Sequence, residues 1–496
     1  PLYYDSRVTY PAWSSAYVNS ALRTYGNASY TAATAHPAVA GAPTLNLSQD
    51  WNDANNGSNF RNDPYRFLVK GGMTLPAGTR VNSSSSGSGQ PCEDSLRTIN
   101  QEQKVPAGRS CWASIPYYPA TFWHWESCSV GAGCIAAPDS NGTLKRYEIR
   151  SGNTMPWHYL DPAKGDNCVL GANCVVAPDG VGKSRRRAYA EEIQNFANWF
   201  SYYRKRKLML AGAMGRVMEN ISGLRMAVVP FNENPTVTML DADDPVASKN
   251  RLAVAGKFYL NSMDALGTPT HQTVKNIAKQ FADNNSVVEY ACQRNNMFIV
   301  TDGFSNTTSI GVPSYSKSTW GGSQPYSTTP TGSLADLALA YYTNRLRTDL
   351  PAGKVPISGS KLANADINPD LHINTYGITL GVRGSLWPNS VDPFVVFPTW
   401  PTPVADDPSM IDDQWHATIN GRGRMYLATN PDETVANLRA GLDDMISQRN
   451  TQGAVAVSSI NLTRGDTRAY QTKYDPSGWT GDVEKVAVNA ATGDVS

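Results

Sequence analysis

Charged residues are scarce in this sequence, and their signs nearly cancel. Asp, Glu, Lys and Arg make up 17% of the 496 residues, which is below the average of about 25% for globular proteins. The chain has 43 Lys and Arg against 42 Asp and Glu, and its net charge is +1. No overall electrostatic field therefore draws this chain to nucleic acid or to anionic lipid.

Long apolar runs are also missing, and so are several catalytic motifs. No stretch approaches the roughly 18 apolar residues of a membrane-spanning helix, so we expect no membrane span within this chain. The sequence contains no Gly-x-Ser-x-Gly, no His-Glu-x-x-His and no phosphate-binding loop. Because these motifs carry common hydrolytic and nucleotide chemistry, we predict that the chain is not an enzyme.

What the sequence does contain is typical of an extracellular protein. Its polarity comes from Ser, Thr, Asn, Gln and Gly, and aromatic residues make up 10% of it, with 12 Trp and 24 Tyr. The length corresponds to about three domains. The chain starts at Pro1 without a leader and stops at Ser496 without a helix end. We therefore expect it to be a fragment at both ends.

Six of the seven cysteines lie in the first 174 residues. Two matched units read C-x-x-G-A-x-C-x-x-A-P-D, and we interpret each as a small loop closed by its own disulfide. The predicted disulfide cysteines are Cys128 with Cys134, Cys168 with Cys174, and Cys92 with Cys111. Zinc binding with His124 and His158 is the alternative, although the five-residue spacing fits it poorly. Cys292 is left over, either buried and free or bonded outside this chain.

Three regions differ in pattern. Residues 1–188 favour short strands and long loops, residues 189–450 alternate helical and strand periodicity, and residues 451–496 begin a new β unit. The expected helices are Glu191–Ile221, Thr270–Phe281, Leu334–Leu346 and Glu433–Ser447. The expected strands are Leu224–Phe231, Met297–Val300, Ile373–Val382 and Arg424–Ala428. Alternation of this kind predicts an α/β fold whose largely parallel sheet is covered on both faces.

Two short motifs place oxygen ligands beside this sheet. Asp302 follows the Met297–Val300 strand, and Thr268 precedes a predicted helix. Ligands of parallel sheets bind at the carboxyl ends of the strands. A carboxylate and a hydroxyl suit Mg²⁺ or Ca²⁺ better than zinc, although each motif alone is also typical of an ordinary turn or helix start.

Several segments resemble a known family. Thr301-Asp302-Gly303 and Gly267-Thr268-Pro269 are similar to two of the three ion-binding loops of a von Willebrand factor A domain. The chain as a whole resembles the PilY/PilC family of bacterial type IV pilus tip adhesins and assembly factors. The matching segments are residues 1–5, 8–11, 194–203, 292–295, 301–303, 413–417, 420–423 and 479–482.

The resemblance implies a fold and an ion site. The fold is a von Willebrand factor A-like sheet with helices on both faces, a large disulfide-rich insertion at residues 1–188, and the first strands of a β-propeller-like domain. Thr268 and Asp302 would help to hold a divalent cation, namely Mg²⁺, Mn²⁺ or Ca²⁺. The remaining ligands would come from a D-x-S-x-S loop, which by family order precedes residue 1.

It also implies a function. The chain would be a secreted adhesin and pilus biogenesis factor at the pilus tip, associated with the outer membrane and the bacterial cell surface. Its partners would be minor pilins of the tip complex and a ligand on a host cell or abiotic surface. The alternative is a structural priming factor for minor pilins with a vestigial metal site. The insertion is our candidate for the adhesive surface, although Trp123, Trp125 and Trp157 could instead form its core.

We also interpret three further motifs. Arg464-Gly465-Asp466 is an integrin-type tripeptide, and it is also typical of a polar turn. The basic runs 183–187 and 204–207 are typical of a solvated helix face. His416 has no evident base or nucleophile beside it in the sequence, so we interpret it as structural.

Overall fold

The structure is a computed structural model that describes three long parts of the chain and a number of separate strands. The long parts are residues 4–48 apart from 6–7, residues 189–261 apart from 243–246, and residues 267–447 apart from 322, 359–363 and 389–391. Between residues 49 and 188, and again after residue 447, it describes strands and a few residues beside them.

A parallel sheet of three strands lies at the centre of the fold. Its order is β15 (Asn295–Thr301), β16 (Ile373–Leu380) and β17 (Arg422–Ala428). All eight residues of the middle strand are buried. This is expected of a parallel strand with helices on both faces.

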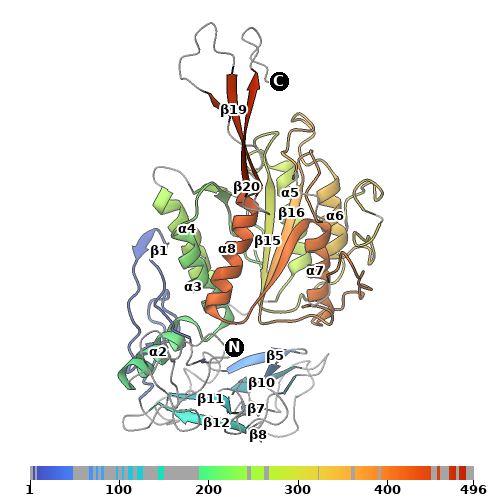
Figure 1. Ribbon diagram of the computed structural model, residues 1–496. Coiled ribbons are helices and arrows are strands. Elements are labelled where there is room, and N and C mark those ends of the chain that lie inside the picture. The colour runs from blue at the N-terminus through green and yellow to red at the C-terminus, as the bar shows by residue number, and fades with distance from the viewer. Residues whose placement is uncertain are drawn as a thin grey trace.

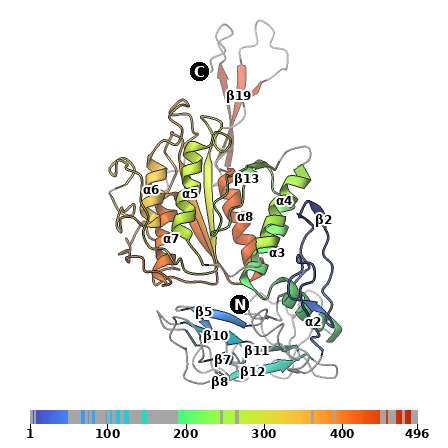
Figure 2. The same cartoon turned by 180° about the vertical axis from the view of Figure 1, so that it is seen from behind.

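Helices cover both faces of this sheet, as Figures 1 and 2 show from opposite sides. On one face lies α8 (Pro431–Ser447), with α3 (Arg206–Met218) packed against it and α4 (Ala247–Asn261) packed against α3. On the other lie α5 (Thr270–Asp283), α6 (Leu334–Thr343) and α7 (Ser409–Asn420). The side chains of the strands divide accordingly: Ile378 packs with α3 and α8, whereas Ile299 packs with α5 and α6. The predicted α/β class is therefore confirmed.

The approach of α7 to the sheet depends on a missing side chain. A Cβ atom at Gly377 of β16 would lie 2.6 Å from Sδ of Met425 and 2.9 Å from Nε2 of Gln414 on α7. Both separations are below any normal contact to a Cβ atom. Glycine at this position therefore lets α7 lie directly against the strand.

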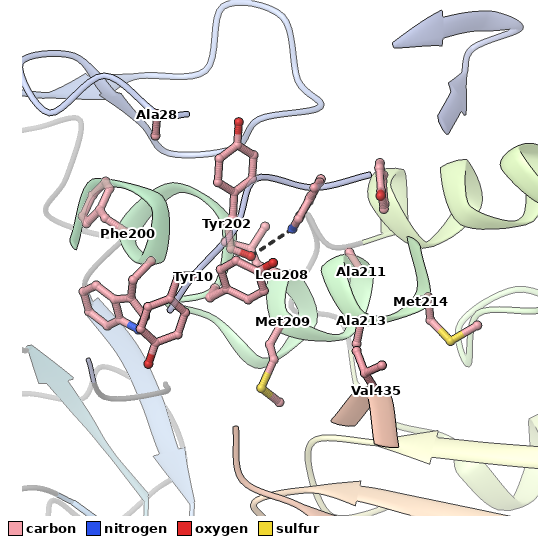
Figure 3. Close-up of a cluster of buried hydrophobic side chains, with 14 of the residues drawn as sticks. Tyr10, Ala28, Phe200, Tyr202, Leu208, Met209, Ala211, Ala213, Met214 and Val435 are labelled. Carbon is pink, nitrogen blue, oxygen red and sulfur yellow. Dashed lines mark hydrogen bonds between the residues drawn. The ribbon is translucent and has the colours of Figure 1, made fainter. Parts of the chain in front are cut away.

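An aromatic segment at the start of the described chain packs on the α3–α4 face. Trp13 packs against Tyr259 of α4 with 4.3 Å between the ring centroids, and its indole donates a 3.1 Å hydrogen bond to the carbonyl of Tyr202. Asn195 of α2 (Tyr189–Tyr202) accepts from the amide of Tyr10 at 2.8 Å. Figure 3 shows side chains of α2, α3 and α8 meeting in this cluster. Part of the region predicted as an insertion thus shares a core with the helices; the boundary at residue 188 stays a prediction.

The remaining described strands are short and antiparallel. Four form one sheet in the order β5 (Arg66–Lys70), β10 (Ser110–Ser114), β7 (Arg80–Asn82) and β8 (Arg97–Thr98). Two-stranded pairs are β1 (Ala16–Val18) with β2 (Ala21–Arg23), β3 (Ala33–Thr34) with β4 (Thr44–Leu45), β6 (Thr74–Leu75) with β9 (Gln103–Lys104), and β11 (Thr121–Glu126) with β12 (Thr143–Glu148). After the last helix come β18 (Val455–Val457), β19 (Arg468–Asp475) and β20 (Thr480–Ala487). This agrees with the short strands expected within residues 1–188 and with the β unit expected after residue 451; a propeller stays a prediction.

Three expectations for the central region are wrong in detail. Segment 224–231 is half-buried, and its two strand residues, β13 (Arg225–Met226), pair antiparallel with β14 (Leu240–Asp241) outside the parallel sheet. The pattern from residue 191 to 221 is two helices, α2 and α3, because the chain turns at residues 203–205. The third concerns Arg204, which is not on a solvated face: it is 1% exposed, and Nη2 donates to the carbonyl of Ala35 at 2.6 Å.

None of the described helices combines the length and the apolar character that crossing a membrane requires.

We predict that Gly377→Ala destabilises the protein by about 1–3 kcal/mol, because the added methyl group overpacks the contact between β16 and α7. Gly26→Ala is the matched control, since a Cβ atom there has no neighbour within 4 Å. It should change stability by less than about 0.5 kcal/mol. Urea denaturation followed by tryptophan fluorescence measures both; equal effects would contradict the packing argument.

Candidate functional site at the carboxyl edge of the parallel sheet

Because the three central strands are parallel, their carboxyl ends lie at one edge of the sheet. The strands end there at Thr301, Leu380 and Ala428, and α5, α6, α7 and α8 begin there. Figures 1 and 2 show this edge facing β5, β10 and β11 of the N-terminal region. Ligands of open parallel sheets bind at this edge, so it is the place to test the residues predicted from sequence.

The structure brings Thr268 and Asp302 into neighbouring loops. The main-chain N–H of Asn306 donates to the main-chain carbonyl of Thr268 at 3.1 Å, and this bond joins the two loops. The Thr268 hydroxyl lies 3.9 Å from the position of a Cβ atom on Gly303. Thr301 closes the second loop, since its hydroxyl donates to the carbonyl of Gly303 at 2.7 Å. The two residues singled out by sequence, 34 positions apart, are therefore neighbours in the fold.

Both side chains have oxygen atoms that the fold does not use. Thr268 and Asp302 are half-buried, and within the described parts of the chain no hydrogen bond or ion pair reaches the hydroxyl or the carboxylate. Two such oxygens are hard ligands of the kind that Mg²⁺ and Ca²⁺ prefer, although either ion needs six or more. No group of three or more His, Cys, Asp and Glu suited to a metal occurs in the described residues. The pair thus fits part of an ion site.

A positive charge also lies at this edge. Nη1 of Arg206, at the start of α3, donates to the main-chain carbonyl of Asp302 at 2.8 Å. Burial, and then the charge of Lys207, lowers the pKa of the neighbouring Lys205 to about 8. Burial, followed by the charges of Arg204 and Lys205, lowers the pKa of His36 to about 4. A guanidinium beside Asp302 attracts anions and opposes the approach of a cation.

A layer of buried polar side chains lies behind the two loops. His271 of α5 contacts Ser305 through Nδ1 at 3.2 Å and Asp413 of α7 through Nε2 at 2.7 Å. The Asp413 carboxylate also accepts from the amides of Leu334 and Ala335 at 2.9 and 3.0 Å. Burial opposes its ionisation, but His271 and the two amides outweigh this and hold the pKa of Asp413 below its usual value. Sequence reasoning missed this cluster, because its members are far apart in the chain.

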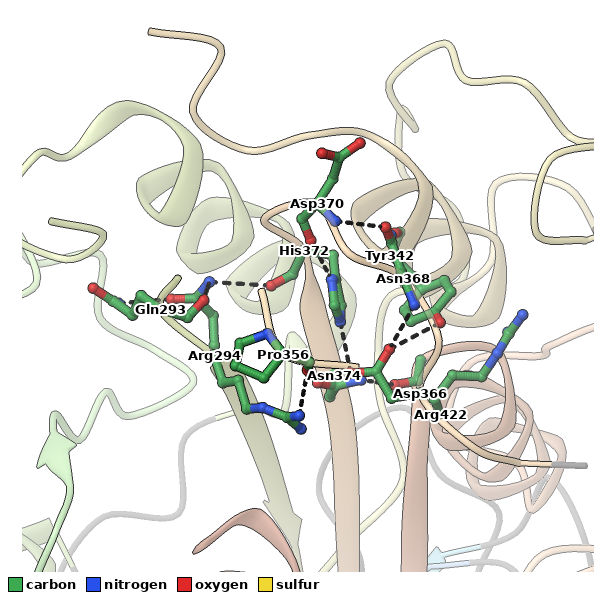
Figure 4. A network of polar contacts seen from close by, with 12 residues as sticks. Gln293, Arg294, Tyr342, Pro356, Asp366, Asn368, Asp370, His372, Asn374 and Arg422 are labelled. Atoms are coloured by element: carbon green, nitrogen blue, oxygen red, sulfur yellow. Dashed lines mark hydrogen bonds and ion pairs between the residues drawn. The ribbon is translucent and has the colours of Figure 1, made fainter. Parts of the chain in front are cut away.

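A second polar network occupies the opposite, amino edge of the sheet (Figure 4). There His372 pairs with Asp366 at 3.0 Å, and both side chains are almost fully buried. The carboxylate also accepts from the hydroxyl of Tyr342 at 3.0 Å and the amide of Asn368 at 3.3 Å. Burial opposes ionisation of Asp366, but His372, Tyr342 and that amide hold its pKa below the usual value. The Asp366 carboxylate is therefore bonded within the protein, and this pair can be compared with the His271–Asp413 pair at the carboxyl edge.

Other predicted residues have different outcomes. His416 is buried and stacks on Trp400 at 4.1 Å between ring centroids, and burial lowers its pKa to about 4. The structural interpretation of His416 fits this environment. Cys292 is free but exposed, so the expectation that a free Cys292 is buried is wrong. The first of the two basic runs, at 183–187, lies outside the described parts of the chain.

The disulfide and integrin-type predictions also fall on residues that the structure does not describe. These are Cys92, Cys128, Cys134, Cys168, Cys174, Arg464, Gly465 and Asp466, and Trp157 lies outside the described residues with them. Of Cys111, Trp123 and Trp125 only the strand backbone is described. The disulfides, the tripeptide and the choice between core and surface for these tryptophans stay predictions.

Comparison with known proteins finds similar sequences among type IV pilus biogenesis factors. The type IV pilus biogenesis factor PilY1 of Pseudomonas aeruginosa strain PAO1 is 26% identical over 368 residues, which cover 62% of this chain and 31% of that protein. PilY1 of strain PAK is 24% identical over 362 residues, and PilY1 of strain UCBPP-PA14 is 24% identical over 364 residues; each match covers 60% of this chain and 30% of the relative. This chain is thus similar to PilY1 over 60–62% of its length, and it spans less than a third of these curated relatives. No family model and no solved structure matches it.

Acid should destabilise the protein through Asp413. Because its pKa is lowered in the folded state, its stabilising contribution is present above about pH 4, the unfolded value, and is lost as the pH falls through the folded value. Asp413→Asn should cost about 1–3 kcal/mol at pH 7. It should also show a smaller fall in melting temperature between pH 5 and pH 2, because asparagine has no proton to gain. Circular dichroism measures both, and parallel curves for the two proteins would contradict this assignment.

Proposed function

We propose that this chain is part of a type IV pilus biogenesis factor that also serves as an adhesin at the pilus tip. The observation that carries the proposal is the similarity to three PilY1 proteins over 60–62% of the chain. The first part of the proposal follows the name of those relatives. The second rests on the carboxyl edge, where two half-buried side chains with unused oxygens lie near an apolar loop.

The central region is proposed to be a von Willebrand factor A-like domain. In support, helices cover both faces of the parallel sheet, and the Thr268 and Asp302 loops lie side by side at its carboxyl edge. These two residues would hold Mg²⁺, Mn²⁺ or Ca²⁺, with further ligands from a D-x-S-x-S loop, water and the partner. The ion would supply a positive centre that accepts a partner carboxylate. Around it, Asn306 keeps the two loops in contact.

An exposed apolar loop extends the proposed docking surface. Between β16 and α7 the side chains of Val395, Val396 and Phe397 are 74%, 58% and 49% exposed. Towards the end of this loop, the amide of Asp406 donates to the carbonyl of Ser305 at 2.8 Å, which joins it to the Asp302 loop. Consecutive exposed apolar side chains are typical of a contact surface. A partner bound at the edge would cover them.

The proposed partners are minor pilins of the tip complex and a ligand on a host cell or abiotic surface. The proposed location is secreted, at the pilus tip and the outer membrane of the bacterial cell surface. The segment within residues 1–188 for which disulfides are predicted adds a second proposed adhesive surface. We propose no catalytic activity for the chain.

A second candidate function is a priming factor for minor pilins with a vestigial ion site. The observation in its favour is Arg206, which brings a fixed positive charge to the carbonyl of Asp302. Such a charge opposes the approach of a cation to Asp302. The two functions differ in what the loss of Asp302 should do.

We predict that a strain carrying Asp302→Ala assembles pili but adheres poorly, because the ion loses its only charged ligand among the described residues. Asp283→Ala is the control, since Asp283 is exposed at the far end of α5 and pairs with Lys279 on the surface. Electron microscopy counts pili, and a plate assay measures adhesion. Loss of the pili themselves would favour the priming function, and normal adhesion would contradict the adhesive role of this edge.

We further predict that changing Val395 and Phe397 together to serine weakens adhesion without lowering the melting temperature by more than about 2 °C, because exposed side chains contribute little to stability. Tyr290→Ser is the control: Tyr290 is 63% exposed and lies just before β15, at the amino edge. It should adhere normally. An equal effect of the two changes, measured in the same plate assay, would show that general surface polarity matters and not this loop.

A further inference from the structure

The buried contact between His271, Ser305 and Asp413 joins the two loops of the proposed ion site from behind. His271 is three residues after Thr268, and Ser305 is three residues after Asp302. Their side chains meet at 3.2 Å, and Asp413 contacts the other ring nitrogen of His271 at 2.7 Å. His271, Ser305 and Asp413 are nearly inaccessible, with exposed fractions of 1%, 4% and 3%. One imidazole therefore bridges the Asp302 loop and α7.

The same carboxylate fixes a third segment. Oδ2 and Oδ1 of Asp413 accept from the amides of Leu334 and Ala335, the first two residues of α6. An anion at a helix N-terminus is favoured by the helix dipole and by the free amides there. Asp413 thus holds α5 through His271 and α6 through its amides, while α7, on which it sits, is packed against the sheet at Gly377.

Serine, histidine and aspartate in this order are also the residue types of a hydrolytic triad. Here the Ser305 hydroxyl is buried and donates to the carbonyl of Thr307 at 3.0 Å within a turn of its own loop. A nucleophile has to reach a substrate. The Ser305 hydroxyl instead contacts His271 and Thr307 in the interior of the protein. The geometry is that of a strut between segments.

We propose that His271 and Asp413 are positioning residues that set the separation between the Thr268 and Asp302 side chains. This inference rests on the ion-dependent function proposed above, and it identifies residues that set the geometry of that ion site. An ion site tolerates errors of only about 0.2 Å in ligand distances, so loops that supply ligands need support from a second layer of residues. In front, the main-chain N–H of Asn306 donates to the carbonyl of Thr268 and so joins the two loops. The buried strut supplies the support behind them.

The amino edge provides a matched control within the same chain. His372 and Asp366 form the same kind of pair, at 3.0 Å and with exposed fractions of 2% and 1%. They lie at the start of β16 and contact neither ion loop. Breaking either pair should lower the melting temperature, whereas only breaking the His271–Asp413 pair should change ion binding.

The test is the affinity for Mn²⁺, measured by isothermal titration calorimetry. It uses the full-length protein purified from the cells that make it, at a temperature where every variant is folded. We expect Asp413→Asn to weaken Mn²⁺ binding by about 10-fold or more, as loss of outer supporting partners does in other metal sites. Asp366→Asn should lower the melting temperature comparably and leave the affinity within about twofold of the unchanged protein.

A second variant covers the case in which Asp413→Asn does not fold. Ser305→Ala removes the link between His271 and the Asp302 loop and leaves the bonds from Asp413 to α6 in place; it should also weaken Mn²⁺ binding. Unchanged affinity in the folded Asp413 and Ser305 variants, with tight binding by the unchanged protein, would overturn the positioning role alone. Equal losses in the Asp413 and Asp366 variants would overturn it too. No binding by the unchanged protein would overturn the ion site itself, and the positioning role with it.

Discussion

The burial of α7 along its whole length is the constraint on which the carboxyl edge depends. All twelve of its residues are buried, and the helix carries two aspartates and a glutamine. A buried polar group without a partner costs free energy, so each of these side chains has to bond to another part of the protein. Asp412 accepts from three consecutive amides at residues 385–387, Asp413 holds α5 and α6, and Gln414 donates to the carbonyl of Ile299. One helix thereby organises the loops after β15 and β16.

This arrangement separates stability from recognition. The loops at the edge are held from behind. Asp412 accepts from the amides of the loop after β16, and Asp413 contacts His271, which reaches Ser305 of the Asp302 loop. The side chains of Asp302 and Thr268 are consequently not needed to keep the loops in place. A partner or an ion can bind them without disturbing the core, which is what a binding edge requires. The loop between β16 and α7 is built in the same way. Near its start the amide of Leu386 donates to Asp412, whereas the side chains of residues 395–397 are exposed.

Periodicity and apolar runs predicted most of the elements in and around the parallel sheet, and they missed α7. α5, α6, α8 and the three parallel strands lie close to their expected ranges. α7 was not predicted as a helix, because Asp412 and Asp413 look like surface residues until their partners are known. The Thr268–Asp302 pair was found through motifs and family resemblance. His271, Ser305 and Asp413 were not, since 34 and 142 residues separate the bonded pairs and no local pattern reports such a contact.

The two edges of the sheet show why the carboxyl edge is the one to expect at an interface. Both contain a buried histidine–aspartate pair, at 2.7 Å and 3.0 Å between nitrogen and oxygen. At both edges, therefore, a buried carboxylate has a partner inside the protein. At the amino edge, the polar contacts around Asp366 end within the protein, on Tyr342, Asn368 and His372. At the carboxyl edge a further layer lies outside the buried pair, and in it, among the described residues, the Asp302 carboxylate is left without a partner. Folding alone gives no reason to keep a half-buried carboxylate unsatisfied beside an arginine. Binding does give a reason, because an ion or a partner group can then bind the Asp302 carboxylate.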